Sequence, residues 1–87
     1  MSKIHKQVLA LEPSQVLEMP FGAQILTVQA QGDDLVVWYS CNPDRQSQQR
    51  AIVLVGTGHD MPDTHTLKYI STVQQGEFVW HFYEAVS

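Results

Sequence analysis

The fold class is indicated most directly by residues 67–84, which read LKYISTVQQGEFVWHFYE. Two runs rich in β-branched and aromatic residues flank Gln75-Gly76, and this pattern is typical of a β-hairpin. In the second run, one aromatic set alternates with a mixed set: Phe78, Trp80 and Phe82 against Val79, His81 and Tyr83. Because successive side chains of a strand point to opposite faces, we expect the aromatic set to anchor the core.

Comparable short runs, separated by turn residues, cover the rest of the chain, and no segment has the apolar spacing of an amphipathic helix. The strands expected from these runs span residues 4–11, 15–19, 24–31, 35–40, 51–55, 67–74 and 77–84. Gly32-Asp33 predicts a hairpin between two of them. The polar stretch from Cys41 to Gln49 predicts an exposed loop with a turn at Asn42-Pro43-Asp44, and Pro62 predicts a single helical turn within 60–65.

We therefore predict an all-β fold, a small antiparallel sandwich or barrel of six or seven strands with at most one short helical turn. Residues 1–87 are expected to form a single domain. The run 51–55 is apolar throughout, which indicates a strand covered on both faces. The expected core comprises Leu26, Val28, Ile52, Leu54, Phe78, Trp80 and Phe82.

Composition narrows the functional classes. Hydrophobic residues make up 44% of the 87 residues and charged residues 16%, which favours a folded domain over disorder. With one cysteine and no signal-peptide pattern, we expect a cytoplasmic protein. The apolar runs are too short to cross a membrane. The net charge is −4 and the basic residues are scattered, which argues against nucleic-acid binding. Because so small a domain is thinly stabilised, we expect a homo-oligomer, most simply a two-fold dimer.

A glycine-containing loop follows the apolar run 51–55. Glycine lets a backbone approach a ligand closely, and successive backbone N–H groups can form a concave anion site. The same pattern is typical of an ordinary turn, with one glycine at positive φ and the other in a close packing contact. The lysine and spacing of a P-loop are missing. The candidate ligand-binding residues are Gly56, Thr57, Gly58, His59, Asp60 and His65, with Arg50 as an anion contact from a neighbouring subunit.

Metal binding and catalysis find less support. His59, Asp60, Asp63 and His65 can all ligate zinc, but their spacing matches no known site, and turns use such residues for local hydrogen bonds. Cys41 with a distant histidine, or His81 beside Glu84 or Tyr83, would be the candidates for catalysis. Neither comes with a local sign of an oxyanion pocket. We expect no metal, no cofactor and no enzymatic activity.

Aromatic residues suggest a binding surface. Trp38, Tyr39, Tyr69, Trp80 and Tyr83 are spread over several strands and cannot all point into one small core. Exposed Tyr and Trp dominate binding hot spots. Packing of both sheet faces, in a sandwich or a homodimer, is the alternative. The candidate partner-binding residues are Trp38, Tyr39, Tyr69 and Tyr83.

Several segments in order resemble a family of small proteins encoded by bacteriophages and prophages. They are Glu18-Met19-Pro20-x-Gly22-Ala23, then Trp38, then Gly56-Thr57-Gly58-His59-x-x-Pro62, then Tyr69-Ile70-x-Thr72-Val73-Gln74, and a closing Phe78-Val79-Trp80-His81. The resemblance covers residues 4 to 84 and carries no assigned activity. It implies an accessory protein that acts in the host cytoplasm by binding a host protein, for instance in counter-defence. A small-ligand or nucleotide-signal sponge that uses the Gly56 to His65 loop is the alternative, and a hydrolase is a third possibility.

Overall fold

The computed structural model describes residues 1–63 and 66–86 of the chain. Within these residues there are seven β-strands and no helix, so the all-β prediction is confirmed. The strands are β1 (Lys3–Leu9), β2 (Ser14–Pro20), β3 (Gln24–Gln31), β4 (Asp34–Cys41), β5 (Ser47–Gly56), β6 (Leu67–Gln75) and β7 (Phe78–Ala85). The expected helical turn is absent from Asp60 to Asp63, and its remaining residues, Thr64 and His65, lie outside the described residues.

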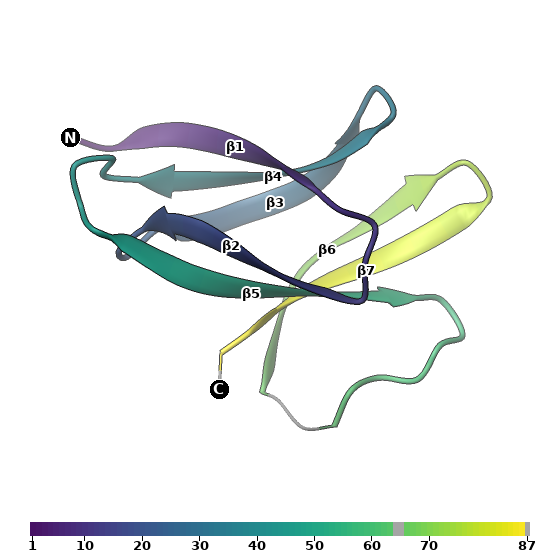
Figure 1. Ribbon diagram of the computed structural model, residues 1–87. Helices are drawn as coiled ribbons and strands as arrows, with labels where there is room; N and C mark the ends of the chain where they lie inside the picture. Colours follow the sequence, from purple (N-terminus) through teal and green to yellow (C-terminus); the bar gives the residue numbers. More distant parts are fainter. Residues whose placement is uncertain (64–65, 87) are drawn as a thin grey trace.

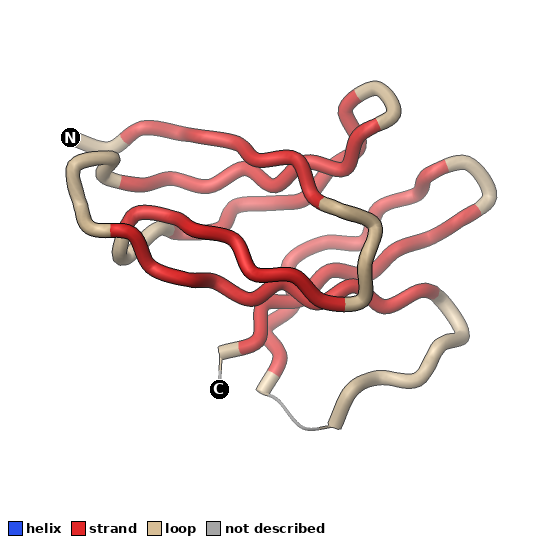
Figure 2. The backbone as a smooth tube through the Cα atoms, viewed as in Figure 1, coloured by secondary structure: helices blue, strands red, loops and turns tan. Residues whose placement is uncertain are grey.

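The strands form two sheets, which we call sheet A and sheet B (Figure 1). Sheet A has the order β1-β4-β3 and sheet B the order β2-β5-β7-β6, with antiparallel pairing between neighbours. The arrangement is sandwich-like, and loops lie at the ends of the strands (Figure 2). The β5–β6 connection is the long one, because β7 lies between these two strands.

Both predicted hairpins are present. β3 and β4 are joined through Gly32-Asp33, and β6 and β7 through Gly76-Glu77. Gly32 and Gly76 have φ of 61° and 59°, a conformation that glycine adopts without steric cost in a two-residue hairpin turn.

β3 and β6 each contain a β-bulge, at which one extra residue interrupts the pairing. The β3–β4 register shifts between Ile25 and Thr27, and the β6–β7 register between Tyr69 and Ser71. The extra residue of β3 is Leu26, which is 45% exposed, while Ile25 packs against the core. The prediction of Leu26 as a core residue is therefore wrong, because the bulge shifts the inward-facing set by one residue.

Along β3 and β6 the two sheets are joined by a side chain. The Val28 backbone N–H on β3 donates to the Ser71 hydroxyl on β6 at 2.8 Å, and the Thr27 hydroxyl lies 3.0 Å from the same oxygen. Ser71 is buried. Its oxygen therefore accepts from a backbone N–H that faces away from β4 and is part of no backbone ladder.

On the opposite side, β1 and β2 face each other without a backbone ladder, and we call this gap the β1–β2 seam. Glutamine amides bridge it. Gln15 accepts from the Ala10 N–H at 3.0 Å and donates to the Ala10 carbonyl at 2.8 Å. Gln7 Nε2 donates to the Glu18 carbonyl at 2.8 Å and to the Tyr39 hydroxyl at 2.9 Å. A side-chain amide has the donor and acceptor of a peptide group, so it can replace part of a ladder.

Most of the predicted core is confirmed. Val28, Ile52 and Phe82 are fully buried, and Leu54 and Trp80 are partly buried against them. The core also contains residues that were not predicted: Leu9, Met19, Ala23, Leu35, Val37, Tyr39, Cys41 and Val73.

Phe78 is a second error in the predicted core. It begins β7 at the hairpin tip, where it is 60% exposed. Its ring stacks on Trp80 at a centroid distance of 5.3 Å. Phe78 has the predicted alternation with Trp80 and Phe82, but at this end of β7 the core no longer covers it.

The polar stretch 41–49 is only partly a loop. Cys41 ends β4 and is buried, and Ser47 to Gln49 begin β5, where they pair with β2. The turn itself is confirmed: the Asn42 carbonyl accepts from Arg45 N–H at 3.1 Å, and Asn42 Oδ1 from Asp44 N–H at 3.1 Å. The polar composition of residues 47–49 led to the wrong prediction of a loop. These residues belong to the β2–β5 pair at the edge of sheet B, whose solvent-facing end needs no apolar residues.

We predict that Phe82→Ala will lower the free energy of unfolding by about 3–5 kcal/mol, because it opens a cavity in the fully buried centre. Phe78→Ala is the matched control on the same strand and should cost about 1 kcal/mol, mainly the lost stacking on Trp80. Urea denaturation of both variants measures the difference. Equal losses would contradict the assignment of the core.

Candidate functional site

The loop that follows β5 is built around its two glycines. The Gly56 carbonyl accepts from the His59 N–H at 3.0 Å, and Gly58 has a φ of 88°. A Cβ at Gly56 would lie 3.1 Å from the His59 ring and 3.2 Å from the Trp80 ring. Gly56 therefore allows close packing and Gly58 allows a tight turn, which are the two structural roles predicted for an ordinary junction.

A hydrogen-bonded chain of side chains begins at Thr57 and runs over the outer face of sheet B. The Thr57 hydroxyl lies 2.8 Å from His81 Nε2, and His81 Nδ1 lies 3.0 Å from the Thr72 hydroxyl. The chain ends at the Tyr69 hydroxyl, 2.7 Å from Thr72. Tyr69 also meets Tyr83 edge to face, with ring centroids 5.6 Å apart. We call Thr57, Tyr69, Thr72, His81 and Tyr83 the β6–β7 outer cluster.

Of the aromatic residues predicted to bind a partner, the structure therefore brings Tyr69 and Tyr83 together. Trp38 lies half-buried on β4, in the other sheet. Tyr39 is 4% exposed and belongs to the core, so it adds nothing to an external surface.

The glycine loop also forms one wall of a groove of about 710 Å³. The opposite wall is the β1–β2 loop, and the lining is mainly apolar: Leu11, Glu12, Pro13, Ser14, Val53, Leu54, Val55, Gly56, His59, Asp60, Met61, Pro62 and Trp80. The lining carries the carboxylates of Glu12 and Asp60 and no lysine or arginine. Such a groove suits an apolar or cationic group better than a phosphate.

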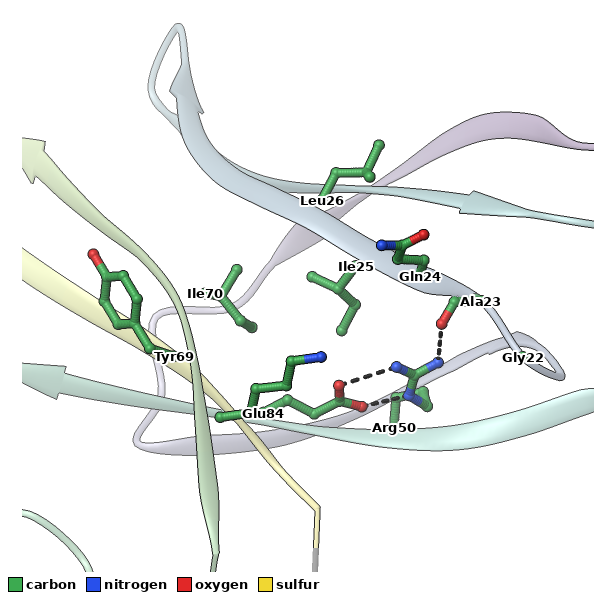
Figure 3. Close-up of a pocket in the computed structure, with 10 residues that line it drawn as sticks. Gly22, Ala23, Gln24, Ile25, Leu26, Arg50, Tyr69, Ile70 and Glu84 are labelled. Carbon is green, nitrogen blue, oxygen red and sulfur yellow. Dashed lines mark hydrogen bonds and ion pairs between the residues drawn. The ribbon is translucent and has the colours of Figure 1, made fainter.

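Arg50 is remote from this groove. It lies toward the opposite end of β5, where it donates two hydrogen bonds to the Glu84 carboxylate on β7 and one, at 2.6 Å, to the Ala23 carbonyl (Figure 3). The side chains of Arg50 and Glu84 are 15% and 10% exposed. Arg50 thus has a partner within its own chain and is held away from Gly56.

The Arg50–Glu84 pair borders a pocket of about 430 Å³ between the starts of β3 and β6. Figure 3 shows Ile25 and Ile70 directed into it, while Leu26 and Tyr69 point away. Lys68 also lines this pocket.

His65 lies outside the described residues, so the possible zinc-binding group of His59, Asp60, Asp63 and His65 is not described as a whole. Within the described residues, no group of three or more His, Cys, Asp or Glu is arranged to hold a metal ion. No helix in the described part of the chain is long and apolar enough to span a bilayer.

The residues considered for catalysis are separated. Cys41 is buried at the end of β4. His81 and Glu84 face opposite sides of β7, since His81 bonds to hydroxyls on the outer face while Glu84 bonds to Arg50 inside.

Sequence reasoning missed Thr72, the Leu11 to Pro13 loop and the role of Glu84. The alternation of His81 with Tyr83 was a usable signal for one face of β7. Which threonines reach His81 depends on the pairing of β7 with β6 and on the position of the β5–β6 loop, which periodicity does not reveal.

The fold and these surfaces define a small two-sheet β protein with a polar–aromatic cluster on the outer face of sheet B and an apolar groove beside the β5–β6 loop. The chain belongs to the family described as domain of unknown function DUF7352, whose model matches residues 1–87. No curated protein and no solved structure matches the chain. The family description does not mention phages, so a phage origin stays a prediction.

We predict that Arg50→Met will lower the free energy of unfolding by about 3–5 kcal/mol, because it leaves the Glu84 carboxylate buried without its partner. Adding Glu84→Leu should restore most of this loss, since no uncompensated charge remains. Lys68→Met, in the wall of the same pocket but exposed, is the control and should change stability by less than about 0.5 kcal/mol. A double variant as unstable as Arg50→Met would contradict this reading.

Proposed function

We propose that this protein is a non-enzymatic binding module that engages another protein through the β6–β7 outer cluster. The observation that carries the proposal is the pair of the exposed Tyr69 and the half-buried Tyr83, with its hydrogen-bonded hydroxyl and imidazole neighbours. Tyrosine offers a large apolar ring and a polar hydroxyl, and it is enriched among residues that dominate binding energy.

Pre-ordering of the cluster supports the same proposal. The Tyr69 hydroxyl is hydrogen-bonded to the Thr72 hydroxyl, and Thr72 is hydrogen-bonded to His81. His81 in turn is hydrogen-bonded to Thr57. Side chains already fixed in the free protein lose less conformational entropy on binding. The remaining donor and acceptor capacity of these hydroxyl groups is available to a partner at the surface.

The finer proposal concerns the biological setting. The Glu-Met-Pro-x-Gly-Ala and Gly-Thr-Gly-His segments resemble proteins encoded by bacteriophages and prophages. A phage accessory protein without enzymatic activity would act in the host cytoplasm by binding a host protein, as in counter-defence.

Affinity capture from a lysate of host cells tests the proposal. A protein retained by the wild type should be lost with Tyr69→Ala, because removal of a hot-spot tyrosine costs about 2 kcal/mol or more of binding energy. Phe21→Ala is the control: Phe21 and Tyr69 are both 56% exposed, but Phe21 lies in the β2–β3 turn. If Tyr69→Ala and Phe21→Ala retain the same proteins as the wild type, the cluster is not the binding surface.

A second candidate function, small-ligand binding, is favoured by the groove beside Gly56, His59 and Asp60. Its apolar lining and the carboxylates of Glu12 and Asp60 favour an apolar or cationic ligand over a nucleotide-like one. A thermal-shift screen should therefore find stabilisation by cationic amphiphiles, with about 2.7 kcal/mol at a hundredfold excess over Kd, and none by nucleotides.

His59→Ala separates ligand binding from structural support. The His59 ring borders the groove and is exposed, so its removal should weaken binding of a stabilising compound while changing stability little. A large loss of stability with unchanged compound binding would make His59 a structural turn residue.

A further inference from the structure

Strand β1 has a row of backbone groups that face away from its own sheet. The β3–β4 hairpin closes on the pair Gln31 and Asp34, so Asp34 and every second residue after it along β4 direct their backbone groups toward β3. The intervening residues of β4 direct theirs toward β1, where they pair with Leu9, Gln7 and His5, whose amides therefore face β4. Alternation then directs the amides of Ile4, Lys6 and Val8 outward. Ala10 follows the same alternation, and its N–H and carbonyl both bond to the Gln15 side chain across the seam.

Of the other edges of the described sheets, those of β3 and β6 are covered, and that of β2 is partly occupied. β3 and β6 lie against each other and share the Ser71 hydroxyl. On β2, the Glu18 carbonyl is occupied by Gln7, and Pro20 has no N–H to donate. Beside the β1–β2 seam, which the Gln7 and Gln15 side chains bridge, β1 has an open edge from Ile4 to Val8: its outward backbone donors and acceptors bond to no described residue.

The side chains on the outer face of this edge are apolar at both ends. Ile4 is 65% exposed and Val8 is 58% exposed, with Lys6 between them. This spacing is symmetric about Lys6. An antiparallel copy of the same strand, related by a two-fold axis at Lys6, would place Ile4 opposite the partner's Val8 at both ends of the contact.

We propose that β1 is the dimer interface of this protein, and that its partner is a second copy of the chain added edge to edge. The outward amides of Ile4, Lys6 and Val8 bond to those of the partner, which joins the two copies of sheet A into one continuous sheet. Each Ile4 and Val8 gains a cross-strand apolar neighbour.

The opposed Lys6 side chains do not prevent this pairing. Each ammonium is drawn back over its own sheet, because Lys6 Nζ donates to Gln31 Oε1 at 2.8 Å and Gln31 lies on β3, at the far edge of sheet A. The two like charges therefore diverge from the two-fold axis.

Sedimentation equilibrium of Lys6→Pro and Lys6→Ala tests the interface. Proline removes an N–H that faces outward and so breaks no bond to β4, and proline is tolerated on edge strands. The wild type and Lys6→Ala should be dimers at micromolar concentration, whereas Lys6→Pro should raise the dimer dissociation constant by at least about tenfold. A monomeric wild type, or a dimer of unchanged affinity in folded Lys6→Pro, would overturn the proposal.

Val8→Lys is a second variant that tests the same interface if Lys6→Pro does not fold. The side chain of Val8 is exposed, so the substitution leaves the core intact while it removes the apolar contact and adds charge at the interface. Val8→Lys should likewise raise the dimer dissociation constant. In the wild type, amide hydrogen exchange at Lys6 should slow as protein concentration rises, and exchange independent of concentration would speak against the interface.

This interface is independent of the proposed partner-binding surface. β1 belongs to sheet A, whereas Tyr69 lies on the outer face of sheet B. Tyr69→Ala should leave the dimer intact, so failure of one proposal is distinguishable from failure of the other.

Discussion

The structure depends on one buried hydroxyl, that of Ser71, which joins the two sheets where no backbone ladder does. Sheets of a sandwich must face each other closely to exclude water, yet the strand at the edge of each sheet has amides left without a partner. β3 and β6 lie against each other next to their bulges, where the Val28 N–H donates to Ser71 Oγ at 2.8 Å. A buried unpaired N–H costs about 1–3 kcal/mol, so this contact is a condition for closing the sandwich here.

Two further boundaries of the sandwich are partly completed by side chains. Gln7 and Gln15 bridge the β1–β2 seam, and the Arg50–Glu84 pair with the Ala23 carbonyl occupies the end where the starts of β3 and β6 diverge. No buried side-chain nitrogen or oxygen of the described residues lacks a partner. Two open sheets leave edges that no backbone ladder completes, and polar side chains replace part of the missing pairing.

The candidate surfaces lie outside the core. The tyrosines and the threonine–histidine chain occupy the outer face of sheet B, and the apolar groove lies between two loops at the end of β5. Each of these surfaces requires residues from strands or loops distant in sequence. The β1 edge adds a third surface, composed of backbone groups and two exposed aliphatic side chains.

The sequence by itself determined the fold class, the two glycine hairpins and the buried positions Val28, Ile52 and Phe82, since period-two alternation and turn chemistry are local properties. It also determined that residues 51–55 are covered on both faces: Ile52, Val53 and Val55 are all buried. Only the tertiary structure decided that Leu26 turns outward, that Tyr39 turns inward and that Arg50 pairs with Glu84. Bulges, strand order and register place these residues, and those arise from which strands meet in space, a nonlocal outcome that periodicity along one strand does not encode.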